Sequence, residues 1–359
     1  MTDANLSPGG ASDQAARETT LTLAAPVTTL RSTAARHDDP DLVHVASAVY
    51  DPTQTLAGQW TRMTDDQVMA AGIDPTRLKN DRSGFVAGIY RAESETRTAL
   101  AFAGTDMTSI KDWTTNLAQG AGLQTQQYAE AVSLAKNVAL AFDKAEVIIT
   151  GHSLGGGLAT AAAAATGITA VVFNPAGVHD NTLKREGLDP VQVKATADRG
   201  QIRNYIVDGE VLNSVQAWFP IPKPIGQRTT LPDPVPLRPL INWIPGANAV
   251  HSLGKHGMAA VAESMAQFVP QHEAFFNGVA SKPVGGSTYE GELLSVLTGR
   301  SGTVTQQVGD QVVEHDRAKL AGYAGTIKAG ATVAIRYNAE ATVGVVKQSR
   351  TQTRGARIA

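Results

Sequence analysis

Short apolar runs alternate with helically spaced apolar residues along most of the chain before residue 281. Strands are predicted where apolar, often β-branched runs lie between polar or glycine residues, at 84–90, 98–103, 147–149, 170–173 and 202–207. Helices are predicted where apolar residues share one face or alanine dominates, at 42–50, 128–142, just after 153 and about 180–198. The polar, mixed region up to Asn80 shows no clear pattern. The repeated strand–helix–strand order favours an α/β fold whose mostly parallel sheet is flanked by helices.

The pattern changes after the linker-like segment 282–286. Apolar and polar residues then alternate as in half-buried strands, at 289–297, 303–308, 311–315, 332–337 and 342–347. Gly309-Asp310 should form a two-residue hairpin turn. We therefore expect four regions, which are a disordered segment 1–40, an α/β domain 41–281, a small all-β accessory domain 287–348 and a basic tail 349–359.

Composition narrows the functional class. The chain has 359 residues, of which 42% are hydrophobic and 18% charged, and its net charge of -2 gives no electrostatic argument for nucleic acid. It has no cysteine, which excludes disulfides, thiolate catalysis and cysteine-based metal sites. The residues before Asp41 lack the pattern of a signal peptide. The longest apolar stretch, 158–173, is interrupted at Thr166-Gly167 and is too short to span a bilayer.

One motif carries chemistry. Residues 151–155 (GHSLG) fit G-x-S-x-G, directly after the strand at 147–149 and before an Ala-rich helix. This context predicts a sharp turn that presents Ser153 as a nucleophile. Side chains at Gly151 or Gly155 would collide with the neighbouring strand and helix. The alternative is a glycine-rich turn with a solvent-facing serine.

Residues 101–117 (AFAGTDMTSIKDWTTNL) resemble the F-x-G-T…DW…N segment of class 3 lipases, and GHSLGG is that family's usual elbow. The resemblance covers about Gly84 to Met265 and implies an α/β-hydrolase fold. By the family's pattern, Thr105 and the backbone N–H of Leu154 would form the oxyanion hole. Ala103 stands where the family usually has arginine, which affects packing and leaves the chemistry unchanged.

The resemblance also implies the other two members of a catalytic triad. Glu210-Val211-Leu212 matches the family's D-x-V element, so Glu210 is the predicted acid, with Asp208 as the alternative. The histidine must follow in the chain. His256, which precedes an Ala-rich helix, fits better than His251.

Two further histidines are given no part in catalysis. His152, inside the elbow, should pack under the turn. His272, after Pro270, looks like a surface linker residue.

The segment 211–250 holds many prolines interleaved with aromatic and aliphatic residues. It is expected to be a long loop without secondary structure. Two interpretations stay open for it. The loop either forms a lid or acyl trough, or is pinned over the core by its apolar residues.

Together these residues predict a serine carboxylic-ester hydrolase, a lipase or phospholipase A, that forms an acyl-serine intermediate and needs no metal or organic cofactor. Its partners would be a lipid or phospholipid substrate at a membrane surface, and a secretion machine or inhibitor protein. The protein would occupy the bacterial cytoplasm before export without a cleavable signal peptide into a target cell, as an antibacterial effector. The region 303–320 faintly resembles KfrB-type domains and is interpreted as a binding or delivery accessory.

Two other functions remain open at this point. One is a serine hydrolase of soluble short esters or peptides. The other is a non-catalytic α/β scaffold whose C-terminal module does the binding.

Overall fold

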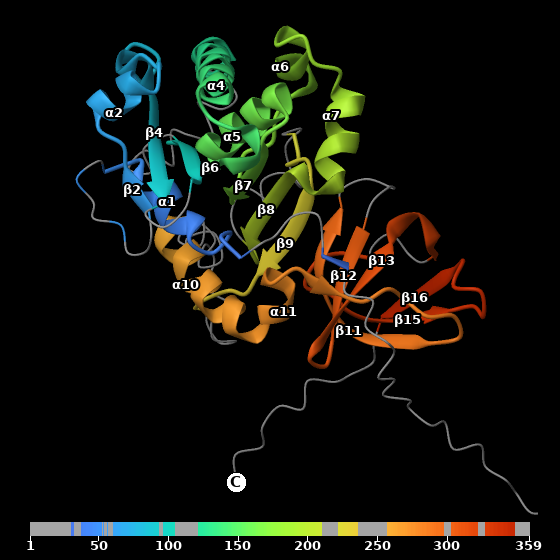
Figure 1. Cartoon of the computed structure of the whole chain (residues 1–359). Coiled ribbons are helices and arrows are strands. Elements are labelled where there is room, and N and C mark those ends of the chain that lie inside the picture. The colour runs from blue at the N-terminus through green and yellow to red at the C-terminus, as the bar shows by residue number, and fades with distance from the viewer. Residues whose placement is uncertain are drawn as a thin grey trace, which may run out of the picture.

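The computed structural model describes residues 30–31, 37–51, 53, 56, 60–92, 96–104, 121–209, 222–235, 257–297, 303–321 and 327–348. Most described strands join one 14-stranded sheet, with β14, β16, β15, β11, β9, β8, β7, β6, β5, β4 and β2 along its path. Helices cover both faces of the half that runs from β9 to β2 (Figure 1). The expected α/β-hydrolase fold with a C-terminal β region is confirmed.

The parallel centre of the sheet contains four strands that the apolar runs predicted, β5 (Thr98–Phe102), β6 (Val147–His152), β7 (Thr169–Phe173) and β8 (Ile202–Val207). A fifth parallel strand, β9 (Gln227–Leu231), was not predicted. On the other side, β5 pairs in antiparallel fashion with β4 (Phe85–Ala92), which confirms the hairpin. The short strands β2 (Trp60–Arg62) and β3 (Lys79–Asn80) extend this edge by pairing with β4. All five parallel strands therefore end at one edge of the sheet.

Two helical layers bury the two faces of this sheet. One core holds residues of α2 (Asp65–Ala70), α4 (Ala121–Ala141), α5 (Leu154–Thr166), α6 (Asp180–Arg185) and α7 (Pro190–Thr196). The opposite core holds residues of α1 (Leu42–Ala48), α10 (Met258–Phe268) and α11 (Glu273–Phe276). The helix predicted over about 180–198 is divided into α6 and α7, because Gly187 adopts a positive φ of 76° between them.

The C-terminal strands follow the predicted positions closely. They are β11 (Thr288–Leu297), β12 (Thr303–Val308), β13 (Gln311–Asp316), β15 (Thr332–Tyr337) and β16 (Gly344–Gln348), with a short β14 (Leu320–Ala321) beside β16. Gly309-Asp310 forms the expected turn, since Val308 pairs with Gln311. Two very short strands, β1 (Leu30–Arg31) and β10 (Val279–Ala280), form a separate pair.

The α/β part and the C-terminal β region share both a sheet and a core. The end of β11 pairs with β9 through Ser295–Thr229, whereas its beginning pairs with β15. Where β11 passes from β15 to β9, its pairing with β12 has a register shift between Leu293 and Ser295. Leu294 and Val312 pack in the core beneath α1 and α10. The C-terminal region is thus joined to the α/β part by strand pairing as well as by the 282–286 segment.

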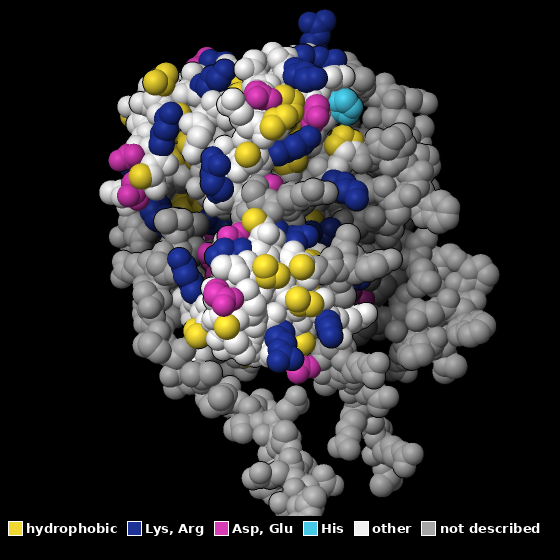
Figure 2. All heavy atoms as spheres, turned by 90° about the vertical axis from the view of Figure 1, so that its right-hand side faces the viewer, with side chains coloured by type: hydrophobic (Ala, Val, Ile, Leu, Met, Phe, Trp, Pro, Cys, Tyr) yellow, Lys and Arg dark blue, Asp and Glu magenta, His cyan; other side chains and the backbone are white. Residues whose placement is uncertain are grey.

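The surface carries charges of both signs. On the face that Figure 2 shows, Lys and Arg side chains are interspersed with Asp and Glu side chains. This distribution agrees with the net charge of -2 and gives this face no single-sign field. None of the described helices combines the length and the apolar composition that a membrane span requires.

Candidate active site

Ser153 occupies the turn between β6 and α5 in a backbone conformation that L-residues rarely adopt. Its φ is 57° and its ψ is -125°, and only 3% of the residue is exposed. Such strain persists only where the surrounding structure enforces it, and it is concentrated at functional sites. The predicted strand–turn–helix geometry is confirmed, while the catalytic role of Ser153 stays a prediction.

Two glycines permit this turn because backbone atoms pass close to them. A Cβ on Gly151 would lie 2.5 Å from the carbonyl carbon and oxygen of Gly155. A Cβ on Gly155 would lie 2.1 Å from the carbonyl oxygen of Phe102, in the adjacent strand. Neither backbone can move aside without breaking the sheet or the helix. The predicted collision with strand and helix is therefore confirmed.

Hydrogen bonds fasten the turn to the next strand. The N–H of Ser153 donates to the carbonyl of Phe173 over 3.2 Å, and the N–H of Ala176 donates to the carbonyl of Ser153 over 2.9 Å. Asn174 lies between these partners at a φ of 41°, and its Oδ1 accepts a 2.9 Å hydrogen bond from the N–H of Val207. The ends of β6, β7 and β8 are thus locked into one rigid edge.

Leu154 is the first residue of α5, so its N–H has no partner within the helix. The positive end of the helix dipole also lies here. Leu154 is therefore placed as its predicted role as an oxyanion donor requires, and that role stays a prediction. Thr105, the other predicted donor, lies outside the described residues.

The residue before Thr105 is held against the elbow by Tyr50. The N–H of Gly104 donates to Tyr50 Oη over 2.8 Å, and the same oxygen lies 3.4 Å from His152 Nδ1. A Cβ on Gly104 would approach the His152 carbonyl oxygen to 2.8 Å, so only glycine fits against the turn. Tyr50 thus connects the two segments that would supply the oxyanion donors.

The two histidines given no part in catalysis have different outcomes. His152 is 1% exposed and packs under the turn, as expected. His272 was expected at the surface, and that prediction is wrong. It is buried, its ring stacks on Phe268 with centroids 4.0 Å apart, and its Nδ1 lies 2.8 Å from the Phe268 carbonyl oxygen.

The described residues place only part of the predicted triad. Glu210, His251 and His256 lie outside them. The Ala-rich helix expected after His256 is present as α10, which begins at Met258. Asp208 is exposed just past the end of β8, where its N–H donates to the Leu231 carbonyl over 2.9 Å. No group of His, Asp and Glu residues suited to a metal ion occurs in the part of the chain that the structure describes.

Sequence reasoning missed two residues that position the elbow. Asn174 had a local signal, since asparagine tolerates positive φ and Asn174-Pro175 directly follows a strand. Tyr50 had none, because its partner His152 lies 102 positions away. Its role follows only from the folded arrangement.

A strained serine between a parallel strand and a helix, at the edge where the sheet's parallel strands end, defines an α/β-hydrolase. The comparison with known families is more specific. The family model described as a Tle-like phospholipase domain matches residues 42–231, more than half of the chain, and the chain belongs to this family. A KfrB domain model matches residues 288–347. The predicted resemblances to lipases and to KfrB-type domains are both confirmed.

One similar protein of known description is the extracellular phospholipase A1 of Serratia liquefaciens. It is 40% identical over 241 residues, which are 67% of this chain and 74% of that protein. Among solved structures, a triacylglycerol lipase from Penicillium expansum matches 55% of this chain and 79% of its own at 12% identity and a TM-score of 0.35. The triacylglyceride lipase of Rhizomucor miehei matches 54% and 77% at 15% identity and a TM-score of 0.36.

Family membership and the site together make this chain an enzyme of the lipase and phospholipase class, a lipid ester hydrolase. That prediction is confirmed. Neither alternative, a hydrolase of soluble esters or peptides or a non-catalytic scaffold, gains support from the family match.

Proposed function

We propose that the chain is a phospholipase A1, which removes the acyl chain at position 1 of a glycerophospholipid. The observation that carries this proposal is the strained, buried Ser153 in a chain 40% identical to an extracellular phospholipase A1. Ser153 Oγ attacks the ester carbonyl while His256, oriented by Glu210, takes its proton. The oxyanion accepts hydrogen bonds from Leu154 and Thr105. His256 then protonates the departing lysophospholipid oxygen, and water activated by His256 releases the fatty acid.

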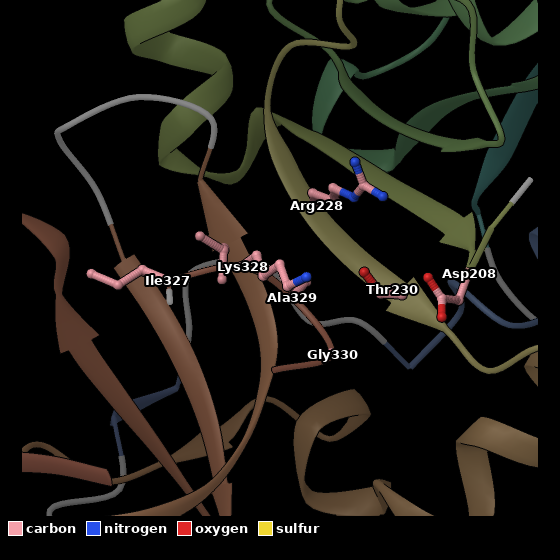
Figure 3. Close-up of a pocket in the computed structure, with 8 residues that line it drawn as sticks. Asp208, Arg228, Thr230, Ile327, Lys328, Ala329 and Gly330 are labelled. Carbon is pink, nitrogen blue, oxygen red and sulfur yellow. The ribbon is translucent and has the colours of Figure 1, made fainter. Parts of the chain in front are cut away.

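Glu210 is favoured over Asp208 as the triad acid because the Asp208 carboxylate lines a separate pocket. The carboxylate of Asp208 lines a pocket together with Arg228 and Thr230 of β9 (Figure 3). His256 is favoured over His251 because it lies two positions before α10. The mechanism uses side chains and backbone amides alone and calls for no metal or organic cofactor.

The decisive experiment follows both fatty acids separately. A phospholipid with different acyl chains at positions 1 and 2 is presented in non-ionic detergent micelles to the wild type, Ser153→Ala and the control Ser133→Ala on α4. We expect release of the position-1 acid by the wild type and Ser133→Ala, and a loss of about 10⁴-fold or more in Ser153→Ala. Undiminished release by Ser153→Ala would refute the nucleophile. Hydrolysis of a short soluble ester without any phospholipid hydrolysis would refute the substrate class.

We also propose that the protein is exported and acts on the membrane of a target bacterium, with a secretion machine and an inhibitor protein as partners. The similar phospholipase A1 of Serratia liquefaciens is extracellular, which supports export. We further propose that the chain consists of an α/β-hydrolase domain at 41–281 and a β domain at 287–348. The β domain would serve as an accessory for delivery or binding. Export from a producing strain, with and without residues 287–359, tests this; equal export of both forms would contradict the delivery role.

A further inference from the structure

A pocket of about 380 Å³ lies where the α/β part meets the C-terminal β region (Figure 3). One wall holds Asp208, at the end of β8, with Arg228 and Thr230 of β9. The other wall includes Lys328, in the segment before β15, and the apolar residues Val296 and Ile327. Its size suits a small ligand or one part of a larger one.

The pocket is built on fixed backbone. Asp208 is held by its hydrogen bond to the Leu231 carbonyl, and Arg228 pairs with Val296 across β9 and β11. The segment that carries Lys328 is fastened by the N–H of Gly330, which donates to the Leu293 carbonyl over 2.8 Å. Both walls therefore belong to one continuous hydrogen-bonded structure.

The lining carries charges of both signs. Asp208 supplies one carboxylate, and Arg228 and Lys328 supply two cations. Neither Asp208 nor Lys328 forms an ion pair with any other residue that the structure describes. A ligand that complements this lining carries an anionic group with several oxygens and, a few bonds away, a cationic group.

We infer that the pocket binds the phosphoethanolamine headgroup of the substrate phospholipid. The phosphodiester would contact Arg228 and Lys328, since guanidinium and ammonium groups recognise phosphate oxygens. The primary ammonium would donate hydrogen bonds to Asp208 and the Thr230 hydroxyl. A quaternary ammonium such as choline has no N–H and is recognised instead by aromatic rings, and none of the described lining residues is aromatic.

Asp208, the pocket residue nearest to the proposed nucleophile, lies within the span of one lipid molecule from Ser153. Ser153 follows β6 and Asp208 follows β8, and the single strand β7 lies between them. Two strand spacings correspond to about 10 Å. In the lipid, the extended chain of bonds from the position-1 carbonyl carbon to the amine spans roughly 12 Å, so the amine can reach Asp208. The phosphodiester, which precedes the amine along the lipid, must then bend toward the long side chains of Arg228 and Lys328, which lie farther from Ser153 than Asp208 does. This inference rests on the proposed function, and it gives the C-terminal region a part in substrate selection through Lys328.

The test compares headgroups on the full-length enzyme. Phosphatidylethanolamine, phosphatidylcholine and phosphatidylglycerol with identical acyl chains are presented at equal, low mole fraction in non-ionic micelles, and a short soluble ester monitors the basal chemistry. Variants are Asp208→Asn, Lys328→Glu and the control Lys347→Glu, which makes the same charge change on β16 outside the pocket.

We expect the wild type to hydrolyse the ethanolamine lipid about tenfold faster, in kcat/KM, than the choline and glycerol lipids. Asp208→Asn should remove most of this preference and keep the soluble-ester activity. Lys328→Glu should lower kcat/KM about tenfold for all three phospholipids, and Lys347→Glu should match the wild type.

Three outcomes would overturn the headgroup site. They are equal wild-type rates on the three lipids, an unchanged preference in Asp208→Asn, or loss of soluble-ester activity in Asp208→Asn, which would make Asp208 the triad acid. None of these contradicts the proposed phospholipase activity, although the third would replace Glu210 by Asp208 in its mechanism. The proposed activity fails instead if the wild type hydrolyses no phospholipid.

Discussion

Arg203 in β8 and Asp39, which precedes α1, form a two-pronged ion pair across 164 positions of sequence. Arg203 Nε donates to Asp39 Oδ2 over 2.7 Å, and Nη2 donates to Oδ1 over 2.6 Å. Tyr205 Oη donates to the same carboxylate over 2.7 Å, and Asp39 is 0% exposed. The pair fastens the start of the α/β part to the middle of its sheet.

Removing one partner of this pair should be costly. Arg203→Leu leaves the buried Asp39 carboxylate without its cation, so we expect the free energy of unfolding to fall by about 3–5 kcal/mol. Chemical denaturation measures this change. The double variant Asp39→Ala/Arg203→Leu should be more stable than Arg203→Leu alone, and a less stable double variant would contradict our interpretation.

The half-exposed pair between Lys194 and Asp180, 2.7 Å apart, serves as the control. Lys194→Leu should change the stability by less than about 1 kcal/mol. A loss as large as that of Arg203→Leu would show that burial does not set the strength of these pairs.

The strained backbone at Ser153 should lower the free energy of unfolding. Ser153→Gly and Ser153→Ala both remove the proposed nucleophile and should be inactive, but glycine adopts a φ of 57° without a Cβ penalty. We therefore expect Ser153→Gly to be about 1–2 kcal/mol more stable than Ser153→Ala in thermal or denaturant unfolding. Equal stability of the two variants would show that the turn stores no strain.

Tyr50→Phe should reduce activity more than stability. The change removes the hydroxyl oxygen that accepts a hydrogen bond from the N–H of Gly104. Gly104 is the residue before Thr105, the proposed oxyanion donor. We expect kcat to fall about tenfold with little change in KM, since misplacement of a donor affects the transition state most. Tyr289→Phe, in the C-terminal region, is the matched control and should keep full activity. A Tyr50→Phe variant with wild-type kcat would exclude the positioning role.

His315 should make stability depend on pH. It is buried between Tyr337 Oη and Gln306 Oε1, each 3.0 Å from one ring nitrogen. Burial lowers the pKa of His315 from its ordinary 6.5 to about 4. Between these values the unfolded chain binds a proton that the folded chain does not, so stability is full above about pH 6.5 and falls as the pH decreases to 4. The loss attributable to this histidine should reach about 3 kcal/mol.

Urea unfolding at several pH values measures this dependence. His315→Phe should flatten it, although the variant will also lose hydrogen bonds at all pH values. Exchange of the exposed His44 for glutamine should leave the slope unchanged. A slope that persists in His315→Phe would assign the effect to other groups.

Elements whose conformation depends on neighbouring residues could be predicted from the sequence. The β12–β13 hairpin follows from alternation on either side of Gly309-Asp310, and Gly309 indeed adopts a φ of 57°. The elbow at Ser153 follows from an apolar strand, a G-x-S-x-G turn and an Ala-rich helix in direct succession. In each case the residues that decide the conformation lie within a few positions of one another.

Tertiary pairing created elements that no local pattern indicates. Gln227–Leu231 (QRTTL) lies in the proline-rich segment that was expected to have no secondary structure, yet it forms β9. The expectation of a continuous loop over 211–250 is therefore wrong at these residues. The strand exists because β8 and β11 supply hydrogen bonds on both of its edges, with Thr229 opposite Tyr205 and Ser295.

By itself the sequence determined the fold class, the sharp turn at Ser153 and the order of most strands, because hydrophobic periodicity and turn residues act over short distances. Only the tertiary structure decided that His272 is buried and that Tyr50 holds Gly104. It also decided that Asp208 faces Lys328 across a pocket between two parts of the chain. These features depend on which distant segments lose their water together when the chain folds, and no window of neighbouring residues contains that information.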